Sequence, residues 1–310
     1  MKILKTIRKF TENHFIIVGL ALVLGVLYGN YLAQYAYLST TLLAAIFFLS
    51  SLKIDLKKVR QYLGDKLVLA IVNIFMLFIL PVAVYYVTNA IYPTLAIAFL
   101  LLAAMPAGMT APLLAEISGG KQSLALVLTV TTSLLAPITA PFIIKTVAGA
   151  QVDVSFWAMF TTLAIVIYIP FIFAQIIKRF WQRAIDKVAI SFKPISVILL
   201  GLLIMVVIAK QSDAIMAGFK NGDESIIYLA ALFIFFLILH LLGHFAIFWK
   251  KRDERITITV CLTYMNFTLA IELANKFFTE PNIVIPVVFS VIPWAIMLIP
   301  YKRIMQKKTS

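Results

Sequence analysis

The chain has 310 residues, of which 63% are hydrophobic and 13% are charged, and its formal net charge is +14. This composition is far more apolar than that of soluble domains, so it excludes a soluble globular fold and predicts an all-α polytopic membrane protein. In a soluble chain such a positive charge would suggest a nucleic-acid partner. Here the basic residues lie between long apolar runs, so the expected partner is the lipid bilayer, and no nucleic-acid partner is expected.

Apolar runs recur along the whole chain. A transmembrane helix needs about 20 mostly apolar residues to cross a hydrocarbon core of about 30 Å. We predict ten such helices, at residues 14–36, 39–54, 67–91, 94–118, 122–147, 155–177, 194–211, 225–249, 256–278 and 283–301. The second run is the shortest. For the first run a cleaved signal peptide is the alternative, but the apolar region is too long and lacks a convincing Ala-x-Ala site.

The polar stretches between these runs are short. The longest, at 178–193 and 211–224, are expected to be loops, and no soluble domain is expected. If the N-terminus is cytoplasmic, 23 of the 27 Lys and Arg residues fall on inside segments. This alternation predicts that both termini are cytoplasmic and that the chain is integral to the plasma (inner) membrane. The single Cys261 excludes internal disulfides and multi-cysteine metal sites.

Residues 105–112, MPAGMTAP, place two prolines and a glycine in the middle of the run 94–118. In lipid, unwound backbone persists only where protein or a water-filled cavity satisfies its polar groups. A break at this depth therefore indicates a binding site. A proline kink without a ligand is the alternative, because neighbouring helices can accommodate one.

A second interruption lies at residues 263–268, TYMNFT, where four polar residues break the ninth run. Aligning Thr110 with Asn266 superposes a methionine, a leucine and a glutamate in each half of the chain. Paired interruptions in two halves of opposite orientation are typical of secondary transporters with an inverted repeat, here of five plus five helices. We predict that a substrate binds where the second half-helices begin, at Met109, Thr110, Ala111, Asn266, Phe267 and Thr268.

The motifs around both interruptions also carry a family resemblance. The first half has PAG at 106–108, GGK at 119–121, and a Thr-containing helix at 124–137 that ends in Ser-Leu-Leu-Ala-Pro; the second half has MNFTLA at 265–270. In order and spacing these motifs resemble the bile acid:sodium symporter family, and the chain looks like a divergent, bacterial-type member of it. The resemblance extends over residues 45 to 300.

This resemblance implies a ten-helix fold in which broken helices four and nine cross in a core domain that moves against a panel. The panel would comprise residues 1–66 (helices 1–2) and 151–222 (helices 6–7), and the core residues 67–150 (helices 3–5) and 223–310 (helices 8–10). Family substrates are organic anions moved together with sodium ions. We therefore expect a symporter of a small carboxylate-type organic anion, working by alternating access; its oligomeric state cannot be read from the sequence.

Few of the residues that bind sodium in the family are present in this chain. Only Thr129 and Asn266 match the pattern, and Cys261 stands where the family has a bridging glutamate. A sodium ion, expected only as a coupling ion and not as a resident cofactor, would need a rebuilt site. The candidates for ion coupling are Asn73, Glu116, Thr129, Thr132, Leu262, Thr263, Tyr264 and Glu272.

Four ionisable side chains within the runs have alternative interpretations. A partly desolvated glutamate could carry a proton, but Glu116 could also mark the solvated end of a half-helix, and Glu272 could pair with Lys276 one turn along. His240 and His244 share a helix face. They could form a proton relay, although interhelical hydrogen bonds are the more common role.

Two alternatives to sodium-coupled transport follow from the same residues. One is proton-coupled or uncoupled transport of an organic anion, and the other is a membrane receptor or sensor on the same fold. An enzyme is not expected, because the chain has no His-Glu-x-x-His, paired-Asp or Gly-x-Ser-x-Gly motif. Trp294 replaces a polar residue that faces substrate in the family, so we expect it in the substrate site and do not assume bile acid recognition.

Overall fold

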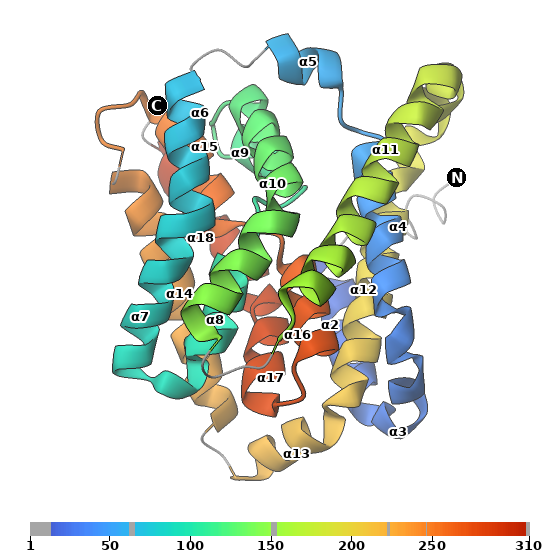
Figure 1. Ribbon diagram of the computed structural model, residues 1–310, viewed down its shortest axis with the longest axis vertical. Helices are drawn as coiled ribbons and strands as arrows, with labels where there is room; N and C mark the ends of the chain where they lie inside the picture. The colour runs from blue at the N-terminus through green and yellow to red at the C-terminus, as the bar shows by residue number, and fades with distance from the viewer. Residues whose placement is uncertain (1–13, 62–65, 150–153, 222–223, 246, 308–310) are drawn as a thin grey trace.

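The structure, a computed structural model, describes residues 14–61, 66–149, 154–221, 224–245 and 247–307. These residues are almost entirely helical and contain no β-strand, although one isolated bridge pairs Ala107 with Met265. Six of the helical stretches in these ranges are long and apolar enough to cross a membrane. One of the six, 156–210, contains two helices that run in opposite directions (Figure 1).

The first part of the chain folds into short helices joined without long loops. They are α2 (His14–Leu27), α3 (Gly29–Leu32), the 3-10 helix η1 (Ala33–Leu38), α4 (Ser39–Ser51) and α5 (Leu56–Gln61). The next predicted span is one continuous helix made of α6 (Lys66–Ile74), the π-helical turn η2 (Phe75–Ile79) and α7 (Leu80–Ile91).

The fourth predicted span is interrupted. It consists of η3 (Pro93–Leu95), α8 (Ala96–Ala103) and, after a non-helical segment at 104–110, α9 (Ala111–Ile117). The long helix α10 (Gln122–Ala148) follows. The break lies at MPAGMTAP, as the sequence predicts, because Pro106 cannot supply a helical N–H.

The middle of the chain corrects one expectation, since neither long polar stretch is only a loop. Here lie α11 (Phe156–Val188), η4 (Ala189–Ser191), α12 (Phe192–Lys210), α13 (Ser212–Asn221) and α14 (Glu224–Phe245). The stretches 178–193 and 211–224 are therefore largely helical. The first is rich in Lys and Arg, which favour helices outside lipid as well, and α11 continues through a kink at Trp181.

The ninth predicted span is interrupted like the fourth. It consists of α15 (Arg252–Thr263), a non-helical segment at 264–266 and α16 (Phe267–Phe277). The chain then forms α17 (Pro281–Phe289) and α18 (Val291–Lys307).

Two groups of helices pack beside each other (Figure 1). In the first, α12 packs on α2 and α4, and α11 packs on α4. Glycines allow this close approach, which matters in lipid, where association depends on packing: a Cβ on Gly25 would lie 2.8 Å from Ile208, and one on Gly201 would lie 2.6 Å from Ile17. The second group comprises α6 to α10 and α14 to α18.

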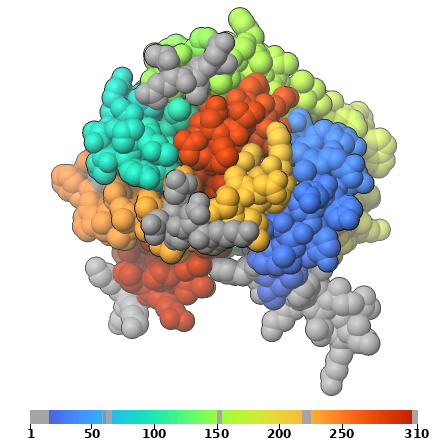
Figure 2. Space-filling view, turned by 90° about the horizontal axis from the view of Figure 1, so that it is seen from below, coloured from blue at the N-terminus to red at the C-terminus, as the bar shows by residue number. Residues whose placement is uncertain are grey.

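The two ends of the bundle can be told apart in Figure 1. The upper end carries α5 and the end of α9, and the lower end carries α3 and α13. Seen from the lower end, the gold α13 and the red-orange α17 lie side by side, with blue N-terminal residues next to α13 (Figure 2). Large apolar side chains such as Leu67, Ile91 and Trp157 are exposed on the outside of the bundle, as expected for a surface that faces lipid.

Candidate functional site

The two non-helical segments cross inside the bundle and satisfy each other's backbone. The N–H of Gly108 donates to the carbonyl of Tyr264 at 2.9 Å, and the N–H of Asn266 donates to the carbonyl of Pro106 at 2.8 Å. Together these two bonds surround the bridge that pairs residue 107 with residue 265. Each non-helical segment therefore gives the other the backbone hydrogen-bond partners that lipid cannot supply.

Helix α10 holds the first segment in place. Thr132 donates its hydroxyl hydrogen to the carbonyl of Leu128 at 2.6 Å and accepts the N–H of Ala107 at 3.2 Å. One turn away, the hydroxyl of Thr129 faces the carbonyl of Gly108 at 3.4 Å. The threonines expected on this helix thus position the crossing.

Asn266 caps the second half-helix. Its Oδ1 accepts the hydroxyl of Thr268 at 2.6 Å and the N–H of Leu269 at 3.4 Å. This arrangement is a helix N-cap, in which a side-chain oxygen satisfies amides of the first turn. The start of α16 therefore has an ordered amide end beside the crossing.

A cavity of about 410 Å³ lies next to the crossing and reaches the upper end of the bundle. Its inner wall is formed by the crossing and by the first turns of α9 and α16, and its opposite wall by α4 and α12. The residues that line the cavity include Met109, Thr110, Asn266, Phe267, Thr268 and Trp294. This volume lies within the usual range for small-molecule sites, about 300–1,000 Å³.

Two lysines stand at the outer part of this cavity. Lys53 follows α4 and Lys193 lies in the first turn of α12, and both are exposed. Among the described residues that line the cavity, Asp55 is the only acidic one. Although Lys53 is exposed as a residue, its partial burial beside the cavity walls lowers its pKa, and the charge of Lys193 lowers it further. The cavity therefore has excess positive charge at its entrance.

Comparison with known proteins agrees with this arrangement. Residues 40–218 match the model of the Sodium Bile acid symporter family, a span that includes the first interruption, whereas the second lies beyond the match. The chain belongs to the Sodium Bile acid symporter family. No curated protein matches the chain. As a member of this family of transporters, the chain is an integral membrane protein, which its apolar helices also indicate.

The structure brings together most of the residues expected at the substrate site of this symporter-family chain. Of the substrate residues, six line the cavity and Ala111 lies fully buried behind them. Of the residues expected at an ion site, Thr129 lines the cavity; those that do not are Asn73, Glu116, Thr132, Leu262, Thr263, Tyr264 and Glu272.

The crossing offers few free oxygens to a sodium ion. The carbonyl of Tyr264 and the hydroxyl of Thr132 are both hydrogen-bonded, and Cys261 is fully buried where the family has a carboxylate. The hydroxyl of Thr263 and Oδ1 of Asn73 are buried without a hydrogen-bond partner among the described residues. A hard cation requires several oxygens at once, so these two atoms alone do not make a sodium cage.

The two glutamates have different environments. Glu116 is exposed, and its Oε2 accepts an N–H of Gln122 at 2.7 Å, so it lies at the solvated end of α9. Glu272 is only 1% exposed and accepts a hydrogen bond from the hydroxyl of Thr40 on α4. Lys276 is exposed and forms no ion pair with it, so the alternative of a Glu272–Lys276 pair is wrong.

His240 forms an interhelical hydrogen bond, the more common of the two roles considered for it. Its Nδ1 lies 2.7 Å from the carbonyl of Phe236, and its Nε2 lies 3.1 Å from the hydroxyl of Tyr264. Because a carbonyl only accepts, Nδ1 carries the hydrogen, and Nε2 accepts the hydrogen of Tyr264. This bond holds Tyr264 in place, and the carbonyl of Tyr264 accepts the N–H of Gly108 at the crossing.

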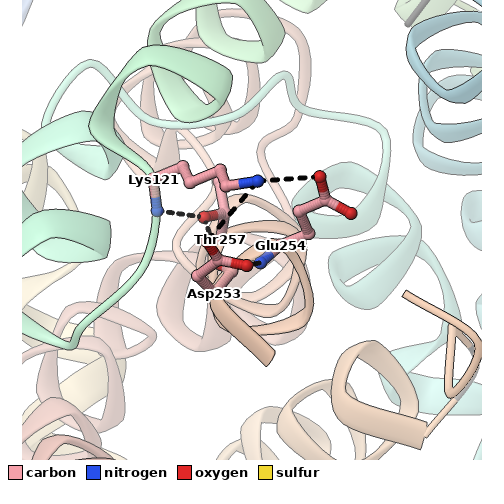
Figure 3. A network of polar contacts seen from close by, with 4 residues as sticks. All are labelled: Lys121, Asp253, Glu254 and Thr257. Atoms are coloured by element: carbon pink, nitrogen blue, oxygen red, sulfur yellow. Dashed lines mark hydrogen bonds and ion pairs between the residues drawn. The ribbon is translucent and has the colours of Figure 1, made fainter. Parts of the chain in front are cut away.

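A polar network at the upper end connects the turn between α9 and α10 to α15 (Figure 3). The N–H of Lys121 donates to the hydroxyl of Thr257 at 2.6 Å, and its ammonium group lies 2.9 Å from Glu254 and 3.4 Å from Asp253. The hydrogen bond to Glu254 is the main cause that raises the pKa of Lys121. Gly119, two residues before Lys121, has φ of 88°, a conformation that favours glycine.

Sequence reasoning missed the wall of the cavity formed by α4 and α12. From the sequence, Lys53 and Lys193 are predicted only as part of the positive-inside pattern. The available signal was spacing, because Ile46, Ser50 and Lys53 lie on one face of a helix and its continuation.

Proposed function

We propose that this member of the Sodium Bile acid symporter family is a secondary active transporter of a small organic anion. The observation that carries the proposal is the cavity, which ends at the crossing of the two interrupted helices and has Lys53 and Lys193 at its entrance. A carboxylate would sit beside the amide ends of the half-helices at Thr110 and Asn266, where the helix dipoles favour negative charge.

The proposal includes the division into a panel and a core, and the five-plus-five inverted repeat. Two observations support it. Helix α12 packs on α2 and α4, and α11 joins them through α4 while it also packs on α10; the interruptions at 104–110 and 264–266 fall in the fourth and ninth predicted spans. Transport would proceed as the core moves against the panel and exposes the crossing to each side in turn.

The positive-inside rule assigns the upper end to the cytoplasm, because Lys53, Lys121 and Lys193 lie there. The cavity reaches this end, whereas toward the lower end α16 contacts α4 and α12. The conformation described is therefore, in our proposal, the inward-facing one.

The size of the cavity and its walls favour a small carboxylate over a bile acid. The rings of Phe267 and Trp294 pack against each other in a tilted arrangement, with centroids 4.9 Å apart, and narrow the site beside Asn266. Trp294 is only 8% exposed. Its indole occupies space that a large steroid body would require.

Coupling to a cation belongs to the proposal as well. Sodium at a rebuilt site near Thr129, Thr263 and Asn73 is the first choice, and proton-coupled or uncoupled transport is the alternative. Sodium dependence would require carbonyl groups of the crossing to supply the remaining ligands.

A thermal-shift screen of the purified protein tests the proposal. Short mono- and dicarboxylates are added with sodium chloride or choline chloride across a pH series, and at least one carboxylate should raise the unfolding temperature. Sodium-dependent stabilisation that is lost in Thr129→Ala but kept in Thr139→Ala would support the rebuilt sodium site, because Thr139 lies on the same helix outside the cavity. No stabilisation by any carboxylate would contradict the proposal.

A further inference from the structure

Four polar residues join α16 to the start of α4 toward the lower end. The hydroxyl of Thr40 donates to Oε1 of Glu272, and Nδ2 of Asn275 donates to the hydroxyl of Ser39 at 3.1 Å. We call Ser39, Thr40, Glu272 and Asn275 the lower seam. The lower seam connects the two helix groups on the side of the crossing opposite the cavity, and none of its residues lines that cavity.

The lower seam contains two buried oxygens that lack a donor. Glu272 is 1% exposed and Asn275 is 8% exposed. Oε2 of Glu272 and Oδ1 of Asn275 have no hydrogen-bond partner among the described residues. A buried carboxylate with one oxygen unsatisfied is strongly unfavourable, because it loses its hydration without compensation.

One proton would satisfy both atoms. Residues three apart on a helix are neighbours, with Cβ atoms about 5–6 Å apart. A proton on Oε2 removes the buried charge and turns that oxygen into a donor. The unsatisfied acceptor one turn along α16 is Oδ1 of Asn275, so a protonated carboxyl has a neighbouring acceptor on the same helix.

The charged groups around Glu272 do not replace this proton. From α12, the ammonium of Lys210 donates to the backbone carbonyl of Asn275 at 3.3 Å, and on α16 itself Lys276 is exposed beside the ring of Phe277. The helices α4, α8 and α17, which also pack on α16, carry no ionisable side chain. From α11, Tyr168 is bonded to a carbonyl of α10, and the charged residues lie from 178 onward, toward the upper end.

We propose that Glu272 is a proton-binding site whose occupancy closes the lower seam. This inference rests on the proposed alternating-access function, in which α16 and α4 separate when the protein faces outward. The separated carboxyl group would meet water on the outer side and could release its proton there. Because Glu272 does not line the cavity, the proton returns to the side from which it came. Proton binding therefore sets the balance between the two conformations, and the proton is not transported.

Distances across the lower end test this inference directly. Spin labels are placed at Tyr31→Cys, next to η1, and Thr279→Cys, after α16; both residues are exposed, and the native Cys261 is fully buried. Pulsed electron paramagnetic resonance in nanodiscs, without any organic anion, then reports the separation over a pH series from about 4 to 9, which includes the range of ordinary carboxyl groups. The short separation should dominate at low pH, and a longer one should grow as pH rises.

Glu272→Gln should hold the short separation at every pH. Glutamine keeps an oxygen for Thr40 and supplies an N–H to Asn275, so it imitates the protonated carboxyl. Glu116→Gln is the control and should behave like the unmodified protein, since Glu116 is an exposed carboxyl outside the seam.

A second pair of variants separates proton binding from simple packing. Asn275→Leu and Ser39→Ala both remove the Ser39–Asn275 bond, but only Asn275→Leu removes Oδ1. Asn275→Leu should therefore shift the midpoint of the transition to lower pH relative to Ser39→Ala. A pH dependence that persists in Glu272→Gln, a separation that never changes with pH in the unmodified seam, or equal midpoints in the pair would overturn the inference. A failure of the transport proposal would instead show as absent uptake with the pH transition intact.

Discussion

Gly108 and Tyr264 come from the two interrupted helices and share a backbone hydrogen bond of 2.9 Å. A Cβ on Gly108 would lie 2.6 Å from the same carbonyl oxygen, which is closer than real Cβ atoms approach. The first interruption therefore depends on the second for its backbone partner and for its shape. A movement of either half-helix must involve the other.

Gly108→Ala should destabilise the protein. The new methyl group must displace the backbone of Tyr264 or break the bond to it, at a cost of about 1–3 kcal/mol. Chemical unfolding in detergent measures the change. Gly19→Ala is the matched control, because a Cβ there meets nothing within 4 Å and helix propensity improves; equal stabilities for the two variants would contradict the crossing.

Lys53→Met and Lys193→Met should each weaken carboxylate binding. The loss of one cation at a solvated cavity entrance is worth up to about 1 kcal/mol, or about fivefold in Kd. Calorimetry with the best carboxylate of the screen measures it. Lys187→Met, an exposed lysine outside the cavity, should leave Kd unchanged.

Carboxylate binding in the cavity should weaken at alkaline pH. Burial and then Lys193 lower the pKa of Lys53 from its ordinary 10.5. Lys53 therefore loses its charge at a lower pH than an ordinary lysine, and affinity should fall as pH approaches 10.5 from below. Lys193→Met removes the neighbouring charge, so in that variant the fall should move to higher pH; a fall at the same pH would show that the two lysines do not interact.

The network of Lys121 should give a small, measurable coupling. A double-mutant cycle with Lys121→Met and Glu254→Gln should return about 0.5 kcal/mol, because the ammonium is partly exposed and screened by solvent. The pKa of Lys121 is raised in the folded protein, so this contribution is present below the ordinary lysine value and is lost as pH rises through the raised one. A coupling that does not decrease at strongly alkaline pH would contradict the ion pair.

Tyr264→Phe should lower the stability of the protein by more than its small change in volume suggests. The hydroxyl of Tyr264 satisfies Nε2 of His240, which is buried and would be left without a donor, at about 1–3 kcal/mol. Thermal unfolding measures the loss. Tyr168→Phe removes a hydroxyl from the half-buried surface of the bundle and should cost less; the reverse order would show that His240 finds another partner.

The interruptions were predictable because their chemistry is local. Proline and glycine at 106–108 and polar residues at 263–268 are unusual in apolar runs, and a break at membrane depth follows from the cost of unsatisfied backbone. The residues that reach the cavity from these segments were predictable for the same reason. The lengths of the helices were harder to predict, because a polar stretch such as 178–188 indicates where the chain leaves the lipid and does not indicate where a helix ends.

The contacts between distant elements were not predictable from one sequence. Thr40 and Glu272 lie in different halves of the chain, and no periodicity relates them. Lys193 likewise gives a signal for orientation only, since a lysine near the end of a span satisfies the positive-inside rule whether or not it lines a cavity. Such pairs are set by tertiary packing of whole helices.

Uptake by proteoliposomes tests the central claim, that the cavity carries a small organic anion across the membrane by alternating access. A radiolabelled carboxylate from the screen is followed in vesicles that hold Ser39→Cys with Asn275→Cys, linked by a short reducible thiol cross-linker across the lower seam. We predict uptake before linking, background uptake once α4 and α16 are joined, and recovery after reduction. Binding of the carboxylate without uptake in any state, or uptake that the link does not change, would contradict the account.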